Sequence, residues 1–204
     1  AEDMKALVKA FKAYITSATG KEFPDKPVDQ LWGAIEAVFE SWHTKRAVDY
    51  RRLHDIPDSM GTAVNIVTMV FGNLGEGSGT GLAFTRDPST GERVLYGEYL
   101  LNAQGEDVVA GTRDPEPIDK LRQTLPAAFG ELERVARTLE RHFRDVQALE
   151  FTIENGKLYM LQTRRAQRTG HASVRIACEM VDEGLLTQEE AVARIPPMDP
   201  DQPL

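Results

Sequence analysis

Cysteine is nearly absent from this sequence, and its scarcity excludes the sites that need several cysteines. The only cysteine is Cys178, so no disulfide can form within the chain and no cysteine-rich zinc site can be built. We therefore expect a reducing compartment, the cytoplasm. No stretch approaches the roughly 18 uninterrupted apolar residues of a membrane helix, and the N-terminal residues lack the apolar core of a signal peptide. Membrane insertion is not expected.

A basic excess is missing as well. The chain has 32 acidic residues against 24 Lys plus Arg, a formal charge of −8. Nucleic-acid binding is not expected, because phosphate affinity requires a basic surface. With 41% hydrophobic and 27% charged residues, the composition is that of a globular protein, which can still hold a nucleotide in a local pocket. The missing initiator Met and the polar, Pro-rich end suggest a piece of something longer.

Apolar residues at helical spacing predict helices at both ends of the chain and in its second half. Residues 2–17 and 28–42 would form a helical hairpin. A long helix is expected after Pro117, running to Phe143, with Arg and Glu on its solvent faces. Residues 172–194 would close the chain as one or two helices.

Strand-like patterns lie between these helices. Residues 62–71 are β-branched and apolar, and 82–86 and 93–99 are short runs bounded by turn residues. Residues 147–164 alternate on both sides of an Asn-Gly pair, which predicts a β-hairpin. Because a regular strand-helix alternation is absent, the sequence predicts an α+β fold with a mixed, mainly antiparallel sheet covered by helices.

Five glycines fall within residues 72–81. The stretch is not a P-loop, because no Gly-Lys-Ser/Thr follows, and not a dinucleotide fingerprint, because a strand is expected next. Contact with a phosphate and a plain flexible turn both remain open.

Glu106 and Asp107 form an acidic pair among small and apolar residues. They fit a phosphate-bound Mg²⁺, which takes oxygen ligands, and equally a turn whose Asn102 and Gly105 are conformational. A hydrolase with paired carboxylates is disfavoured, because neighbours on an extended strand point to opposite faces.

The expected hairpin contains a second polar group, whose arrangement depends on register. A two-residue turn at 155–156 would place Gln162 opposite Leu149, away from Glu150. A three-residue loop would instead gather Glu150, Gln162 and Arg164 on one face. A carboxylate, an amide oxygen and a guanidinium on one face suit Mg²⁺ and phosphate. An ordinary salt-bridged strand face would show the same pattern.

Other reactive side chains have simpler readings. The four histidines lack metal-ligand spacing and are expected mostly at the surface, and His171 at a helix start is not expected to be a phosphorylation site. Trp32 and Trp42 are expected in the core, and Cys178 is expected to be a buried, inert thiol.

Eight short segments together span most of the chain and carry a specific resemblance: residues 50–53, 61–65, 69–73, 78–81, 84–88, 102–111, 150–153 and 161–164. They resemble the pyruvate phosphate dikinase family. The resemblance implies an ATP-grasp fold, whose two lobes clasp MgATP and transfer its β-phosphoryl end to a histidine on a swivelling domain. It assigns 1–45 to a helical subdomain, 46–168 to the C-terminal nucleotide-binding lobe and 169–204 to a helical connector.

The resemblance also implies roles for particular residues. Glu150 and Gln162 match residues around nucleotide and Mg²⁺, as cofactor and metal ligands. Arg164 matches the arginine directed at the polyphosphate, and Glu106 with Asp107 match an acidic pair near the reaction centre. Aligned charges and metal suffice for such roles, because phosphoryl transfer needs little covalent work from the protein.

The implied partners lie outside these residues. Thr80 and its glycines resemble the loop near the phosphates, whereas the other ATP-grasp lobe, the phosphohistidine domain and the pyruvate/phosphoenolpyruvate barrel are absent. A homodimer is one option for the parent. The piece alone is expected to be inactive.

Two departures from the family pattern leave alternatives open. Ala148 stands where an acid is expected, and Glu76-Gly77 replaces what is often an acidic pair. One alternative is therefore a degenerate homologue with a regulatory or structural nucleotide-binding role. Another is a related dikinase such as phosphoenolpyruvate synthase.

Overall fold

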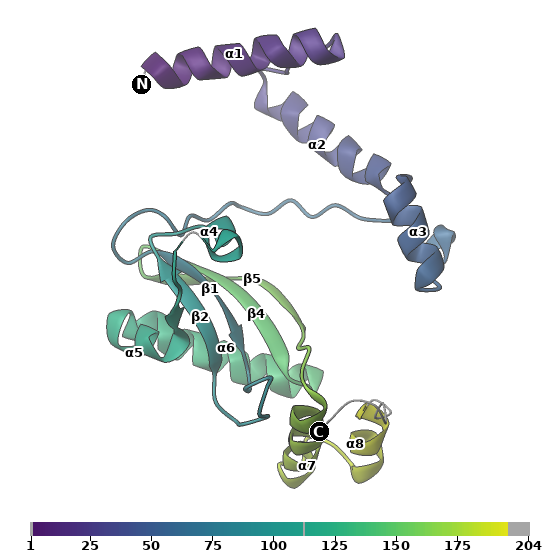
Figure 1. Ribbon diagram of the computed structural model, residues 1–204, viewed down its shortest axis with the longest axis vertical. Coiled ribbons are helices and arrows are strands. Elements are labelled where there is room, and N and C mark those ends of the chain that lie inside the picture. The colour runs from purple at the N-terminus through teal and green to yellow at the C-terminus, as the bar shows by residue number, and fades with distance from the viewer. Residues whose placement is uncertain (1, 112, 196–204) are drawn as a thin grey trace. The chain divides into compact units, whose positions relative to one another are not determined.

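The computed structural model describes residues 2–111 and 113–195, apart from the side chains of 108–110. The chain divides into two units, one up to Thr68 and one from Met69 onward (Figure 1). The end of the expected C-terminal connector, residues 196–204, lies outside the described residues.

The first unit is helical. It contains α1 (Glu2–Thr19), α2 (Pro27–Ser41), α3 (Lys45–Leu53) and a 3-10 turn (Asp58–Met60). Proline in the first turn of α2 starts that helix, because its fixed φ suits the position. Both expected N-terminal helices therefore form.

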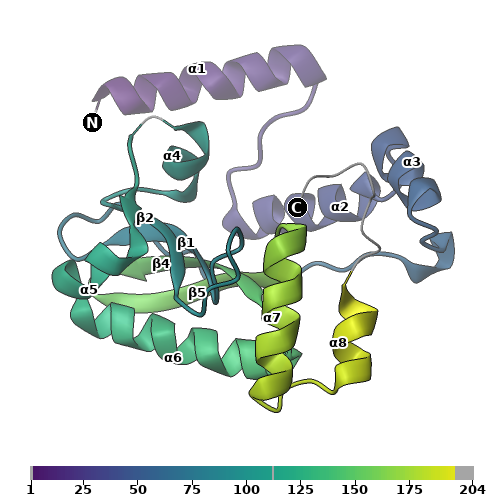
Figure 2. The same cartoon turned by 60° about the horizontal axis from the view of Figure 1, so that its bottom comes forward.

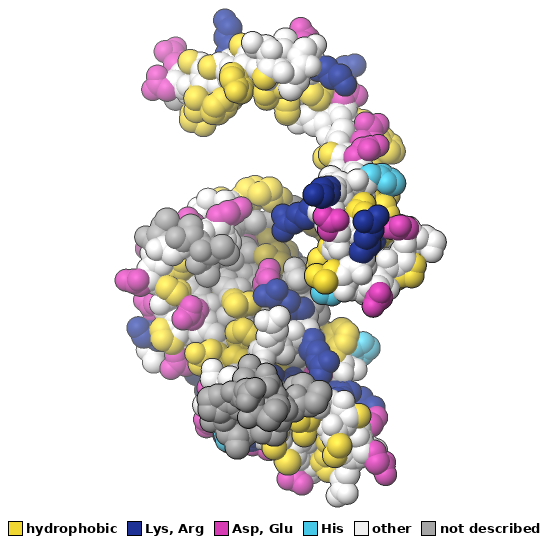
Figure 3. Space-filling view, turned by 45° about the vertical axis from the view of Figure 1, so that its right-hand side comes forward, with side chains coloured by type: hydrophobic (Ala, Val, Ile, Leu, Met, Phe, Trp, Pro, Cys, Tyr) yellow, Lys and Arg dark blue, Asp and Glu magenta, His cyan; other side chains and the backbone are white. Residues whose placement is uncertain are grey.

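The packing of these helices differs from the expected hairpin. Neither α1 nor α2 contains a buried residue, and the apolar side chains of α1 lie open in Figure 3. Trp32 is 60% exposed, so its expected place in the core is wrong. Trp42 is half-buried, with the Arg51 guanidinium 3.9 Å from its ring centroid.

The expected strand over residues 62–71 is wrong. These residues have no regular secondary structure, and Ile66, Val67 and Met69 are exposed. Strand propensity without a neighbouring strand does not form a ladder, because sheet stability comes from cross-strand pairs.

The second unit contains a five-stranded antiparallel sheet in the order β3-β2-β1-β4-β5. This confirms the α+β class and the antiparallel pairing. The strands are β1 (Gly79–Phe84), β2 (Tyr96–Leu101), β3 (Glu116–Pro117), β4 (Gln147–Glu154) and β5 (Lys157–Arg165).

One face of the sheet is covered by α5 (Leu121–Thr124) and α6 (Pro126–Phe143), and Figure 2 shows α6 running beneath the strands. The expected single helix is broken at Leu125, whose φ of −137° and ψ of 69° are non-helical. Proline disfavours the helical conformation of the residue before it, so a new helix starts at Pro126. Buried side chains of α6 and the sheet form the main core: Phe129, Leu132, Leu149, Phe151 and Ile153 among them.

A smaller core lies at one end of the sheet. It is formed with α7 (Gly170–Asp182) and α8 (Gln188–Arg194), the expected C-terminal pair, and includes Ala148. Cys178 is exposed on α7, so the buried thiol expected there is wrong. All four histidines are exposed, as expected.

Among the described residues, no helix is long and apolar enough to cross a membrane.

Candidate functional site

The β4–β5 hairpin builds the polar face, by a route other than the one expected. Its turn has two residues, Asn155 and Gly156, with φ of 50° and 80°, as a type I′ turn requires. Such a turn pairs Glu154 with Lys157, and continued without interruption it would bring Gln162 opposite Leu149.

A β-bulge corrects the register further along the strands. Phe151 pairs with Met160, but Glu150 pairs with Gln162, which leaves Leu161 as the extra residue. The expected pairing of Glu150 with Gln162 is therefore confirmed, whereas the three-residue loop expected to produce it is wrong.

Paired residues of an antiparallel ladder share a face, so the polar group is assembled across three strands. Glu150 and Gln162 face each other, and Thr80 lies on the neighbouring strand opposite Thr152. The guanidinium of Arg164 is 3.9 Å from the Glu150 carboxylate, and the two side chains are 59% and 41% exposed. An ion pair this open is worth little in stability, so both groups remain accessible to a ligand.

A cleft of about 820 Å³ lies over this face, since Thr80, Leu82, Glu150 and Thr152 line it, whereas the alternate residues Leu149, Phe151 and Ile153 pack in the core with α6. Its volume is within the range of small-molecule sites. Thr80, Glu106, Glu150 and Arg164 line it; Gln162, beside Glu150, and Asp107 are not among the lining residues.

Apolar side chains form much of the cleft wall, and these residues were not singled out from the sequence. They are Met69, Val70, Leu82 and Leu161. Leu161 is 54% exposed because the bulge leaves it outside the regular alternation. The apolar run at residues 62–71, before most of the glycines, was the available signal for Met69 and Val70, but its β-branched composition predicted a strand.

Thr80 is held more tightly than a loop residue would be. It is 4% exposed, and its hydroxyl donates to the Phe151 carbonyl at 3.0 Å. The last residues of the glycine-rich stretch thus belong to β1, and only residues 72–78 form an irregular loop.

Glu106 and Asp107 lie in the first turn of the short helix α4 (Gly105–Ala110) and not on a strand. Glu106 is exposed at the cleft. Asp107 accepts the N–H of Gln104 at 2.8 Å, which caps the helix. Asn102 has a left-handed φ of 47°, as the turn interpretation expected. The strand argument used against a paired-carboxylate hydrolase is therefore wrong.

The oxygen atoms of these side chains fit a divalent cation whose other ligands are phosphate oxygens and water molecules. No group of three His, Cys, Asp or Glu side chains suited to a metal occurs among the described residues. Glu150 lines the cleft and Gln162 pairs with it on β5, so the two residues offer one carboxylate and one amide oxygen side by side. Mg²⁺ commonly binds through one or two carboxylates plus substrate phosphates.

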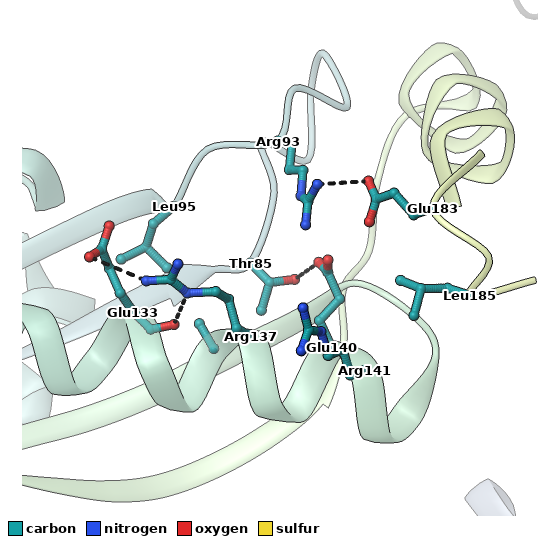
Figure 4. Close-up of a pocket in the computed structure, with 10 residues that line it drawn as sticks. Thr85, Arg93, Leu95, Glu133, Arg137, Glu140, Arg141, Glu183 and Leu185 are labelled. Atoms are coloured by element: carbon teal, nitrogen blue, oxygen red, sulfur yellow. Dashed lines mark hydrogen bonds and ion pairs between the residues drawn. The ribbon is translucent and has the colours of Figure 1, made fainter. Parts of the chain in front are cut away.

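A second cavity, of about 440 Å³, lies between α6, the β1–β2 loop and the C-terminal helices (Figure 4). Its carboxylates already face arginines. Glu140 and Glu183 are each 2.9 Å from Arg86, and Glu133 is 3.6 Å from Arg137. Internal ion pairs account for this cavity, so the cleft over the open sheet face is the better candidate site.

Comparison with known proteins gives matches to one family of nucleotide-binding domains. A family model described as "Pyruvate phosphate dikinase, AMP/ATP-binding domain" matches residues 25–129 and 120–185.

Full-length relatives extend the match to nearly the whole chain. The chain is 59% identical over 196 residues to "Pyruvate, phosphate dikinase" of Clostridium symbiosum, covering 96% of the chain and 22% of the relative. For the same-named protein of Rhizobium meliloti the identity is 53% over 214 residues, with 99% and 24% covered. For "Pyruvate, phosphate dikinase 1, chloroplastic" of Arabidopsis thaliana it is 50% over 202 residues, with 99% and 21% covered. The chain thus spans between a fifth and a quarter of these relatives, and it belongs to the pyruvate phosphate dikinase AMP/ATP-binding domain family.

Proposed function

We propose that this chain is one ATP-grasp lobe of a pyruvate phosphate dikinase and that it binds MgATP in the cleft over the open sheet face. The parent would convert ATP, phosphate and pyruvate to AMP, pyrophosphate and phosphoenolpyruvate through a phosphohistidine. The carrying observation is the convergence of Glu150, Gln162 and Arg164 on one face beside an apolar wall.

Each part of the cleft suits a part of the nucleotide. The wall containing Met69, Val70 and Leu161 offers apolar contact to a base, and Arg164 offers a planar fork for phosphate oxygens. Glu150 and Gln162 would hold Mg²⁺, which supplies charge neutralisation of the phosphates.

The remaining assignments concern the mouth of the cleft. Glu106 lines the cleft from α4 and would act near the reaction centre. Asp107 would act there by holding the first turn of α4 in place, since its carboxylate caps that helix. Thr80 would act through the position of its strand, because its hydroxyl already donates to a carbonyl.

We infer that the chain alone does not turn over pyruvate. The other lobe, the phosphohistidine domain and the pyruvate/phosphoenolpyruvate barrel would come from the rest of the parent, which fits the chain's share of its relatives. The domain division at 1–45, 46–168 and 169–204 and a homodimeric parent remain part of this proposal.

The compartment of the parent also remains a prediction. The single cysteine favours the cytoplasm, whereas four plant relatives carry the word chloroplastic in their names.

The test is calorimetric titration of MgATP into the chain and into its Glu150→Ala/Gln162→Ala double variant, repeated in a protein containing both lobes. We expect binding that the double variant weakens at least tenfold, because it removes both metal-facing oxygens. Glu131→Ala is a matched control, since Glu131 is an exposed carboxylate on α6 whose ion pair among the described residues is with exposed Arg134. Unchanged MgATP affinity of the two-lobe double variant would contradict the site.

A second candidate rests on Ala148. This residue is 3% exposed and packs in the smaller core. On β4 it pairs with Arg164 of β5. A parent without an acid at this position could keep nucleotide binding for regulation or assembly. The Ala148→Asp variant of the parent separates the two: a large gain in phosphoryl transfer supports a decayed enzyme, and unchanged transfer in a variant that remains folded argues that this position was never critical.

A further inference from the structure

The tip of the β4–β5 hairpin contacts the two irregular segments that border the nucleotide cleft. One is the stretch 69–71, which has no helix or strand, and the other is the glycine-rich loop 72–78. Neither segment is part of a sheet ladder or a helix, so tertiary contacts hold it: those with the hairpin tip and, for the loop, those with Asn102 and Ala103.

The first contact comes from Glu154, the last residue of β4. Its Oε2 accepts the backbone N–H of Phe71 at 2.6 Å, across 83 positions of sequence. Phe71 directly follows Met69 and Val70, which line the cleft. A charged acceptor makes a stronger hydrogen bond than a neutral one, so this contact is well suited to fix the apolar wall.

The second set of contacts holds the glycine-rich loop. The Oγ of Ser78, which is fully buried, accepts the N–H of Asn155 at 3.1 Å. The N–H of Gly156 donates to the Gly77 carbonyl at 2.7 Å. On the other side, the Ser78 carbonyl accepts the N–H of Asn102 at 2.8 Å. Ser78 is thus tied to both the hairpin tip and the strand end that leads to α4.

Glu154 has a rival interpretation as another metal ligand. It lies four residues from Glu150 on the same strand and therefore on the same face of the sheet. Its carboxylate, however, engages a main-chain N–H, and it is not among the residues that line the cleft. A main-chain N–H needs an oxygen acceptor, which a glutamine also offers, whereas a glutamate that binds a metal also supplies a negative charge, which glutamine lacks.

We propose that Glu154 and Ser78 are positioning residues, which anchor the apolar wall and the glycine-rich loop of the MgATP cleft to the hairpin tip. The inference rests on the proposed function. Without the anchors, nucleotide binding must order these segments itself, and the entropy of that ordering reduces the affinity.

The experiment uses the full-length parent protein with Glu154→Ala, Glu154→Gln and Ser78→Ala, and with Glu131→Ala as a remote carboxylate control. Two quantities are measured: hydrogen exchange of the Phe71 and Asn155 amides without nucleotide, and the Kd for MgATP by calorimetry. Urea midpoints show whether each variant remains folded.

We expect Glu154→Ala to accelerate exchange at Phe71 and to raise the Kd about tenfold, because it removes the acceptor. Glu154→Gln should restore both quantities to within about threefold of the unaltered protein, because an amide oxygen still accepts. Ser78→Ala should accelerate exchange at Asn155 and raise the Kd in the same direction.

Several results would overturn the inference. Unchanged exchange at Phe71 in Glu154→Ala would show that the anchor is absent, whether or not nucleotide binds. Equal loss of affinity in the Gln and Ala variants would assign Glu154 to the metal. If the unaltered protein binds no MgATP while the exchange effects appear, the proposed function fails and the anchoring stands without its role in binding.

Discussion

At the scale of single residues, the most demanding side chain is Arg86. Its side chain is fully buried and lies 2.9 to 3.0 Å from carboxylates of Glu140, Glu179 and Glu183. Burial alone lowers the pKa of Arg86, but hydrogen bonds and charges from Glu140 and Glu183 outweigh it and raise the pKa above its ordinary value. The arginine thus stays charged and joins β1, α6 and α7.

Replacement of Arg86 by alanine should destabilise the protein by about 3 to 5 kcal/mol, because it leaves carboxylates near one another without their buried partner. Urea unfolding followed by fluorescence measures this. The exposed pair of Arg134 with Glu131 provides the control, since Arg134→Ala should cost less than about 1 kcal/mol. A loss below 1 kcal/mol for Arg86→Ala would show that the network does not support the fold.

Asp87, the next residue, makes a pH-dependent contribution. Slight desolvation raises the pKa of Asp87, but the N–H groups of Ser89 and Thr90, at 2.7 and 3.2 Å, outweigh it and lower the pKa below 3.8. A lowered pKa means that the carboxylate stabilises the folded state above pH 3.8, and that this stabilisation disappears as the pH falls through the folded-state pKa.

Asp87→Asn keeps the acceptor and removes the charge. We expect the variant to be less stable at pH 7 by under about 1 kcal/mol, because the group is near solvent, and equal to the unaltered protein in strong acid. Unfolding free energies at both pH values test this. A difference that grows toward acid would mean that the sign of the pKa shift is opposite.

At the scale of elements, the glycine content of the loop at residues 72–78 has a steric reason. A Cβ built on Gly72 would lie 2.2 Å from the Ala103 carbonyl oxygen and 2.8 Å from that of Gly79. These are backbone atoms, which cannot move aside as a flexible side chain can. The loop must therefore pass between two chain segments too close for any side chain.

Gly72→Ala should destabilise the protein by about 2 kcal/mol or more, because overpacking against backbone displaces the loop. Gly130→Ala is its control: Gly130 lies within α6 with nothing near its would-be Cβ, so alanine should stabilise by about 0.5 to 1 kcal/mol. Thermal unfolding of the two variants tests both signs. Equal effects of the two substitutions would refute the close approach at Gly72.

The elements that were predicted correctly are those whose sequence signal lies within a few residues. The helix periods and the Asn-Gly turn were correct because each depends on residues within a few positions. The break at Leu125 could have been predicted from Pro126, because a residue before proline disfavours the helical conformation. The failed strand at 62–71 had the right propensity but lacked a partner, which no local pattern specifies.

At the scale of the whole molecule, the two units differ in how much apolar surface they bury. The unit from Met69 onward contains both hydrophobic cores. In the unit up to Thr68, the buried residue among those described is Arg51, and no apolar side chain is buried. Helices without a buried apolar face are marginal in water, because most helix stability in proteins comes from tertiary packing.

A polypeptide of residues 69–204 should therefore unfold cooperatively with urea, whereas a peptide of residues 1–60 should show weak helicity that melts gradually. Circular dichroism of the two distinguishes them. A sharp, cooperative transition of the peptide at low concentration would contradict this assignment of stability.

The candidate site illustrates how far each source of information reaches. The alternation allowed two registers: a three-residue loop would place Glu150, Gln162 and Arg164 on one face, and a two-residue turn would not. The pairing in the sheet places them on one face. The hairpin reaches this pairing through a two-residue turn followed by a bulge at Leu161, which shifts the register by one residue. The alternation of residues alone could not predict the bulge. The family resemblance, carried by short motifs, needed no coordinates.

Local patterns in the chain settled its class and most of its helices and strands, because periodicity and turn chemistry act over a few residues. Long-range contacts settled the rest. The cleft wall from Met69, the carboxylates around Arg86 and the exposure of Trp32 depend on which distant segments meet or fail to meet. Burial and hydrogen bonding between such segments are properties of the folded chain, and no short stretch of sequence contains them.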